Sequence, residues 1–153
     1  MNPLNANLQY SGSGLALTEQ FEGVRLAAYQ DSVGVWTIGF GHTQGVTEGM
    51  TCTQFQAEQW LLQDVQWAIG VVKQMVEVVL NQPEFDALVD FVFNVGSGNF
   101  AGSTMLKLLN VGNYWAAADE FVKWDLAGGQ VVAGLLRRRI AEQSEFNSGG
   151  IPS

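Results

Sequence analysis

Three polar residues near the start of the chain have the types and spacing that acid–base chemistry requires. Glu22 ends a segment that we expect to be helical, Asp31 lies in a following turn, and Thr37 belongs to the next strand. The C-terminus of a helix disfavours a carboxylate anion, so we expect Glu22 to hold a proton. Asp31, in an exposed turn, should stay ionised. One protonated and one ionised carboxyl are what hydrolysis of a glycosidic bond needs.

The strand that carries Thr37 has an unusually open face. Thr37, Gly39 and Gly41 alternate with apolar residues, so that this face has one hydroxyl and two absent side chains. A ligand could approach the backbone there, and we therefore predict that Gly39 contacts substrate and that Thr37 holds a water beside Asp31. The alternative is an ordinary strand with glycines at bulges, which the spacing alone favours.

The elements that must position these residues follow from the hydrophobic periodicity. A short helix over about 13–22 precedes a hairpin formed by residues 26–29 and 35–40. A long helix over about 53–79 begins with Thr53 and Gln56, which form a capping box. Further helical segments, separated by Gly-rich loops, fill residues 83–147.

This order of elements predicts an α+β fold with segregated parts. We expect a sheet lobe over about 13–52, a connector helix over about 53–79 and a helical lobe over about 83–147, with a ligand cleft between the lobes. The polar ends of the chain, 1–12 and 148–153, are predicted to be a flexible arm and a flexible tail.

Composition excludes several classes of function. Fifteen acidic residues against seven basic ones give a formal charge of −8, which argues against nucleic-acid binding. One cysteine cannot form an intrachain disulfide, and one histidine gives no metal cluster, so we expect neither metal nor cofactor. We see no membrane span and no signal peptide, and we expect a monomer, made in the cytoplasm, without stable membrane insertion.

The segment from Glu22 to His42 resembles the signature of the phage-type lysozymes, glycoside hydrolase family 24. It matches the pattern E-G-x-x-L-x-x-Y-x-D-x-x-G-x-x-T-x-G-x-G-H. Similarity to the lambdoid endolysins of this family continues through Phe93–Gly96, Ser103–Thr104 and Trp124, and covers roughly residues 15–147.

This resemblance implies a lysozyme-like fold and a muramidase that cleaves the β-1,4 bond between N-acetylmuramic acid and N-acetylglucosamine. It implies Glu22 as general acid, Asp31 as catalytic carboxylate and Thr37 as the residue that helps to place the water. The partner would be the peptidoglycan of a host cell wall, reached through holin-dependent release and ending in lysis. Alternatives are a catalytically silent scaffold with the same fold and a secreted antibacterial effector.

Other residues have weaker signals. Asn94 and Thr104 could hydrogen-bond sugar, although capping and loop roles suit both. One arginine of the run 137–139 could reach Glu22, and we favour Arg138 as a substrate-binding residue.

His42 and Asp64 are predicted to form a structural ion pair. Asp64 falls in register with the apolar residues of its helix, and a buried lone carboxylate is costly unless it is paired. His42 is the single histidine of the chain, and the family resemblance supports placing the two residues together.

Overall fold

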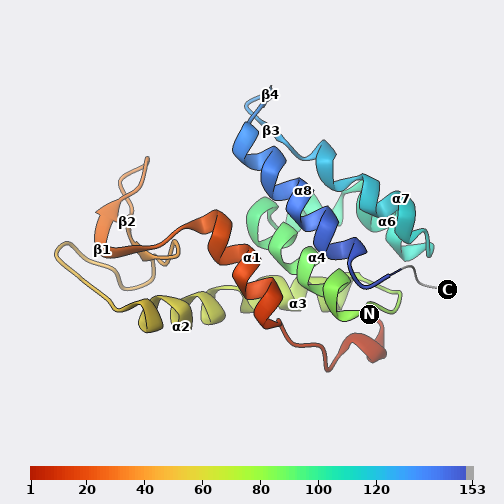
Figure 1. Ribbon diagram of the computed structural model, residues 1–153, viewed down its shortest axis with the longest axis horizontal. Coiled ribbons are helices and arrows are strands. Elements are labelled where there is room, and N and C mark those ends of the chain that lie inside the picture. Colours follow the sequence, from red (N-terminus) through yellow and green to blue (C-terminus); the bar gives the residue numbers. More distant parts are fainter. Residues whose placement is uncertain (151–153) are drawn as a thin grey trace. The chain divides into compact units, whose positions relative to one another are not determined.

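The computed structural model describes residues 1–150 and divides the chain into two compact units. One, the sheet unit, is Thr18–Gln66; the other, the helical unit, joins Met1–Leu17 to the chain from Trp67 onward. Helices and small antiparallel sheets make up both (Figure 1). The predicted α+β class is confirmed, with small antiparallel sheets and helices in separate stretches of the chain.

The sheet unit is built around one hairpin. It contains the end of α1 (Gly12–Glu22), then β1 (Arg25–Gln30), β2 (Trp36–Gly39) and α2 (Gln54–Asp64). β1 and β2 are antiparallel, with Tyr29 opposite Thr37 and an irregular register nearer Arg25. An isolated antiparallel bridge also joins Ala27 of β1 to Thr51.

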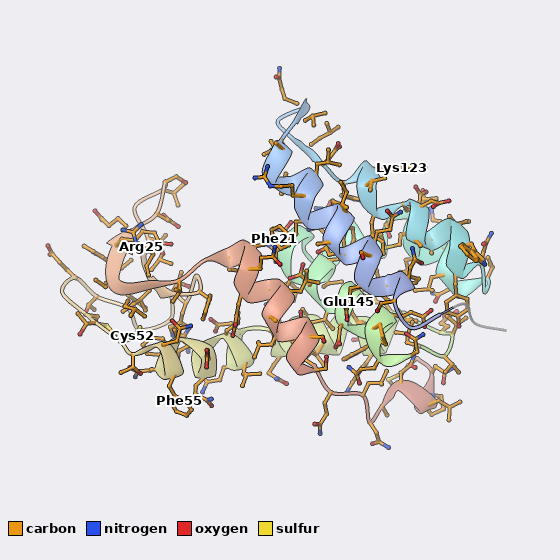
Figure 2. The ribbon with its side chains drawn as sticks, in the orientation of Figure 1. Phe21, Arg25, Cys52, Phe55, Lys123 and Glu145 are labelled. Carbon is orange, nitrogen blue, oxygen red and sulfur yellow. The ribbon has the colours of Figure 1, made fainter. Side chains whose placement is uncertain are left out.

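Helix α2 supplies the apolar face against which the hairpin folds. Thr53 caps its start by accepting the Gln56 N–H at 3.1 Å, as the sequence predicts. Ala57 and Leu61 of α2 are buried, as is Ile38 of β2. Phe55, by contrast, is 70 % exposed and projects away from the helix (Figure 2).

The single connector helix predicted over 53–79 is wrong in two respects. The structure has α2 followed by α3 (Gln66–Met75), with a turn at Val65. At this break the side chain of Gln66 donates to the Leu62 carbonyl at 2.9 Å, which competes with regular helix bonding.

The second difference is the end of α3 at Met75 rather than at residue 79. Asn110 donates to the Met75 carbonyl at 3.0 Å and accepts the Glu77 N–H at 2.8 Å. This side chain from another helix satisfies the backbone groups that a continuing helix would have paired.

The helical unit packs its helices around α4 (Gln82–Val95), whose residues from Glu84 to Val92 are all buried. Helix α8 (Ala133–Asn147) lies beside α4 (Figure 1). Phe91 at the centre contacts other aromatic rings edge-on. The remaining elements are η1 (Pro3–Asn5), α5 (Ser97–Ala101), α6 (Thr104–Asn110), α7 (Tyr114–Asp119), η2 (Phe121–Lys123), β3 (Leu126–Ala127) and β4 (Gln130–Val131).

The predicted flexible arm over 1–12 is instead docked on the helical unit. Asn5 is fully buried, donates to the Val78 carbonyl at 2.8 Å and accepts the Leu80 N–H at 2.9 Å. The Ser11 N–H and hydroxyl both donate to the carboxylate of Asp86. The polar composition of the arm thus reflects hydrogen bonding to α4 and to the segment before it. The predicted tail 148–153 extends beyond the described residues.

None of the helices found in residues 1–150 combines the length and apolarity of a membrane span.

Candidate active site

Glu22 is the last residue of α1, where the chain turns sharply into the hairpin. Gly23 adopts a left-handed conformation, with φ of 68°, and its N–H donates to the Glu19 carbonyl at 3.0 Å. This is a helix end that favours glycine. Gly41 lies close to the half-buried Glu22 side chain, since a Cβ added to Gly41 would be 3.6 Å from Glu22 Oε2. The glycine therefore keeps the space beside this carboxyl open.

Asp31 closes the turn between β1 and β2 through its own side chain. The N–H groups of Val33 and Val35 donate to Asp31 Oδ1 at 3.0 and 2.8 Å. The Asp31 N–H donates to the Val35 carbonyl at 2.9 Å. Because both side-chain bonds use Oδ1, the carboxylate is held in place while Oδ2 stays available to a water.

Thr37 is tied to the same turn. It is 4 % exposed, and its hydroxyl donates to the Val35 carbonyl at 2.9 Å. The Val35 carbonyl therefore accepts bonds from both Thr37 and the Asp31 backbone. With its proton engaged, the Thr37 hydroxyl oxygen can act toward a water only as an acceptor.

Gly39, predicted to contact substrate, has a packing role in the structure. Its φ is 66°, and a Cβ added there would lie 3.1 Å from the Ala57 Cβ and 3.3 Å from the Ala57 Cα. The missing side chain thus lets β2 approach α2 closely. A substrate contact through the Gly39 backbone stays a prediction.

His42 and Asp64 lie together as the sequence suggests, with His42 Nδ1 2.8 Å from Asp64 Oδ2. The His42 ring also stacks on Trp60, with ring centroids 4.7 Å apart and planes 6° from parallel. His42 is 6 % exposed, while the Asp64 side chain is 27 % exposed. The pair links the turn that follows β2 to the last residue of α2 and provides a structural connection within the sheet unit.

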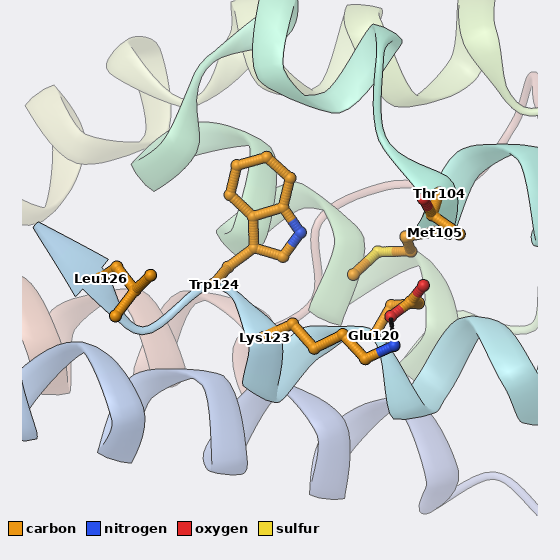
Figure 3. A pocket seen from close by; sticks show the side chains of 6 residues that line it. All are labelled: Thr104, Met105, Glu120, Lys123, Trp124 and Leu126. Carbon is orange, nitrogen blue, oxygen red and sulfur yellow. Dashed lines mark ion pairs between the residues drawn. The ribbon is translucent and has the colours of Figure 1, made fainter. Parts of the chain in front are cut away.

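The other candidate substrate residues belong to the helical unit. Arg138 forms a bidentate pair with Asp90, its Nε 3.0 Å from Oδ2 and its Nη2 2.8 Å from Oδ1. Asn94 accepts a bond from Arg139 Nη2 at 2.8 Å. Thr104 is exposed and lines a cavity within this unit (Figure 3). That Asn94, Thr104 and Arg138 bind substrate stays a prediction.

Burial shifts the pKa values of several ionisable groups in the two units. Desolvation, followed by the neighbouring Asp90, raises the pKa of Glu142 well above its usual value. Desolvation lowers the pKa of Arg139, whose Nε lies 2.6 Å from Glu142 Oε1. In the sheet unit, burial and the nearby Glu58 raise the pKa of Glu19.

Sequence reasoning missed three contributors to this site. The Val35 carbonyl and the stack on Trp60 were not foreseen, nor was the place of Gly41 beside Glu22. One usable signal existed, because Trp60 and Asp64 are four residues apart and so share a helix face. Within residues 1–150 there is no cluster of three or more side chains suited to a metal ion.

Comparison with known protein families and proteins finds similarity over nearly the whole length of the chain. The family model described as "Phage lysozyme" matches residues 19–142. The endolysin of Salmonella phage P22 is 44 % identical over 146 residues, covering 92 % of this chain and 99 % of the relative.

Solved structures agree with this similarity. An endolysin from Escherichia coli O157:H7 phage FAHEc1 superposes with a TM-score of 0.86 at 35 % identity, covering 97 % of this chain and 99 % of that one. The muramidase domain of SpmX from Asticaccaulis excentricus gives 0.86 at 38 % identity, covering 92 % and 98 %. The chain therefore belongs to the phage lysozyme family.

Proposed function

We propose that this protein is an endolysin-type muramidase, a glycoside hydrolase that cleaves the β-1,4 bond between N-acetylmuramic acid and N-acetylglucosamine in peptidoglycan. The observation that carries the proposal is the geometry of the hairpin site. The Asp31 N–H and the Thr37 hydroxyl both donate to the Val35 carbonyl, and the Glu22 side chain lies beside Gly41, just after β2. Membership of the phage lysozyme family and the named endolysin and muramidase relatives support it.

Glu22 acts in this proposal as the general acid. Its protonated carboxyl donates to the glycosidic oxygen as the bond to the anomeric carbon breaks, so the leaving sugar departs as a neutral alcohol. Gly41 leaves the sugar ring room to come within hydrogen-bond distance of this carboxyl. A side chain at Gly41 would narrow that approach.

Asp31 and Thr37 supply the other half of the reaction by holding one water. Asp31 Oδ2 accepts one proton of the water, and the Thr37 hydroxyl oxygen accepts the second because its own proton is held by Val35. With both protons engaged, a lone pair of the water is directed at the anomeric carbon. Attack from the face opposite the leaving oxygen inverts the anomeric centre, with Asp31 as general base.

We further propose that the protein is made in the host cytoplasm and reaches the wall after release through a holin. Its named endolysin relatives support action on the cell wall. Some other relatives bear the name SAR-endolysin.

Analysis of the digestion products tests the proposed reaction. Purified sacculi digested with the protein should give fragments with N-acetylmuramic acid at the new reducing end, released first as the α-anomer. Reducing-end N-acetylglucosamine, or a 1,6-anhydro sugar, would contradict the assigned bond or the role of water. Release of the β-anomer would contradict inversion while leaving the muramidase assignment intact.

A further inference from the structure

The carboxylate of Asp86, on α4, binds the residue that precedes α1. Asp86 is 1 % exposed. Its Oδ1 accepts the Ser11 N–H at 3.1 Å, and its Oδ2 accepts a hydrogen bond from the Ser11 hydroxyl. Gln82 donates to Oδ1 at 2.8 Å and, with the same amide nitrogen, to the Gln9 carbonyl at 2.7 Å. A buried carboxylate with three donors is firmly placed, so Asp86 fixes the backbone where α1 begins.

Ser11 connects this carboxylate to the helix. Its carbonyl accepts the Leu15 N–H at 2.9 Å. Its hydroxyl oxygen accepts the Gly14 N–H at 3.3 Å, while the hydroxyl proton is donated to Asp86. Ser11 therefore acts as the N-cap of α1, and this cap is itself bound to a buried side chain of another helix.

Gly14 allows the start of α1 to approach Asp86 closely. It is buried, and a Cβ added there would lie 2.9 Å from Asp86 Cγ and would also meet the ring of Tyr10. A Cβ at Gly12, in the same turn of the helix, would meet nothing within 4 Å. Since neither glycine has a positive φ, the missing side chain at Gly14 serves this packing rather than a special backbone conformation.

Helix α1 connects this fixed start to the reaction site as one unbroken element (Figure 1). It begins in the helical unit and ends in the sheet unit, and Glu22 is the last of its 11 residues. At about 1.5 Å per residue its ends are about 16 Å apart, so tilting α1 by about 5° would move Glu22 by about 1.4 Å. A displacement of about 1 Å at a reacting group can cost about 10²-fold in rate.

We propose that Asp86 is a positioning residue for Glu22. By binding both polar groups of Ser11, Asp86 sets the tilt and rotation of α1, and α1 in turn holds the Glu22 carboxyl at a fixed angle to the glycosidic oxygen. The inference rests on the proposed function, because it takes Glu22 as the general acid. Asp86 acts through Ser11 and α1, so its effect falls on the rate of the chemical step rather than on substrate binding.

Steady-state kinetics on soluble, uncross-linked peptidoglycan strands test the inference, because kcat and KM are measured separately. We expect folded Asp86→Ala and Ser11→Ala each to lose about 10–10²-fold in kcat, with KM within a factor of about two. Ser11→Thr keeps the hydroxyl and should retain most of the kcat. Gly14→Ala, which pushes the start of the helix away from Asp86, should also lower kcat.

Two matched controls separate positioning from stability. Asn113→Ala, like Ser11→Ala, removes a capping side chain, the one that accepts the Ala116 N–H at 3.1 Å at the start of α7. It should cost a similar amount of stability without lowering kcat. Gly12→Ala adds the same methyl group to α1 as Gly14→Ala does, but in open space, and should leave kcat unchanged.

The backbone N–H signal of Gly23 reports the far end of α1 without any substrate. This N–H donates to the Glu19 carbonyl at 3.0 Å and follows Glu22 directly in the chain. In ¹⁵N-labelled protein, we expect the NMR signal of Gly23 to shift in Asp86→Ala and to stay in place in Asn113→Ala. Loss of stability alone would not move the signal of one residue at the other end of the helix.

The inference is overturned by unchanged kcat in a folded Asp86→Ala variant, by a loss that appears in KM alone, by an equal loss of kcat in Asn113→Ala, or by a Gly23 signal that does not move. Should Asp86→Ala fail to fold, Ser11→Ala and Gly14→Ala decide the matter by the same measurements. If the proposed muramidase activity is absent, the unmodified protein releases no fragments, whereas the Gly23 signal still tests whether Asp86 sets the end of α1.

Discussion

Replacement of Gly39 by alanine measures how closely the strand of the site must approach α2. The new Cβ has two costs. At a φ of 66°, a residue with a side chain is destabilised by about 1–2 kcal/mol. The Cβ would also lie 3.1 Å from the Ala57 Cβ, and overpacking of this kind costs about 1–3 kcal/mol. We expect Gly39→Ala to lower the free energy of unfolding by roughly 2–5 kcal/mol in total.

Gly34 offers a matched control in the same hairpin. Its φ is 88°, but a Cβ there would meet nothing within 4 Å. Gly34→Ala therefore has the backbone cost alone, roughly 1–2 kcal/mol. Urea denaturation of the two variants, analysed by linear extrapolation, gives the packing cost as their difference.

The packing argument also predicts a rescue. Ala57→Gly removes the atom that the new Cβ meets, although by itself it costs about 0.5–1 kcal/mol in a helix. In the double variant, relief of the contact with the new Cβ should outweigh the cost of Ala57→Gly. We therefore expect a favourable coupling energy of about 1–3 kcal/mol between the two substitutions. Equal destabilisation by Gly39→Ala and Gly34→Ala, or no coupling to Ala57, would refute the reasoning. A raised KM for Gly39→Ala, at unchanged folded fraction, would indicate that this backbone also touches substrate.

Three further substitutions probe the charges of both units, each by urea denaturation. The raised pKa of Glu142 means that the folded state holds this proton more tightly than the unfolded state, so the free energy of unfolding should fall as pH rises above about 4.5. Glu142→Gln should abolish that decline. If the free energy of unfolding of the variant changes with pH as steeply as that of the unmodified protein, the prediction is contradicted. Asp90→Asn removes the bidentate counter-charge of the buried Arg138 and should cost about 3–5 kcal/mol, and a loss below 1 kcal/mol would count against the pairing. Asp64→Asn removes a partly exposed partner of His42 and should cost only about 1 kcal/mol while wall digestion continues; inactivation of the folded variant would contradict a structural role.

The sequence could predict the hairpin site because its determinants are local. Glu22, Asp31 and Thr37 are positioned by a helix end, a side-chain-closed turn and a two-residue strand period, all within one short segment. Glycine at 23 and Thr53 likewise indicate helix boundaries from their own residue types.

Features decided by distant residues could not be predicted in this way. The end of α3 depends on Asn110, and the docking of the N-terminal segment depends on Asn5 meeting residues 78 and 80. Their polar side chains suggest solvent exposure when the sequence is considered alone. The role of Gly39 was equally hidden, because a missing side chain suits a ligand as well as the neighbouring Ala57.

The most direct test of the central claim compares Glu22→Gln with Glu19→Gln in the rate at which purified sacculi are digested. The two positions lie on the same helix three residues apart, and both substitutions keep the shape of the side chain. If Glu22 is the general acid, its variant should lose about 10²–10⁴-fold in rate while remaining folded, and Glu19→Gln should stay within a few-fold of the unmodified protein. More than a tenth of the original rate in folded Glu22→Gln, or equal losses in both variants, would contradict the assignment.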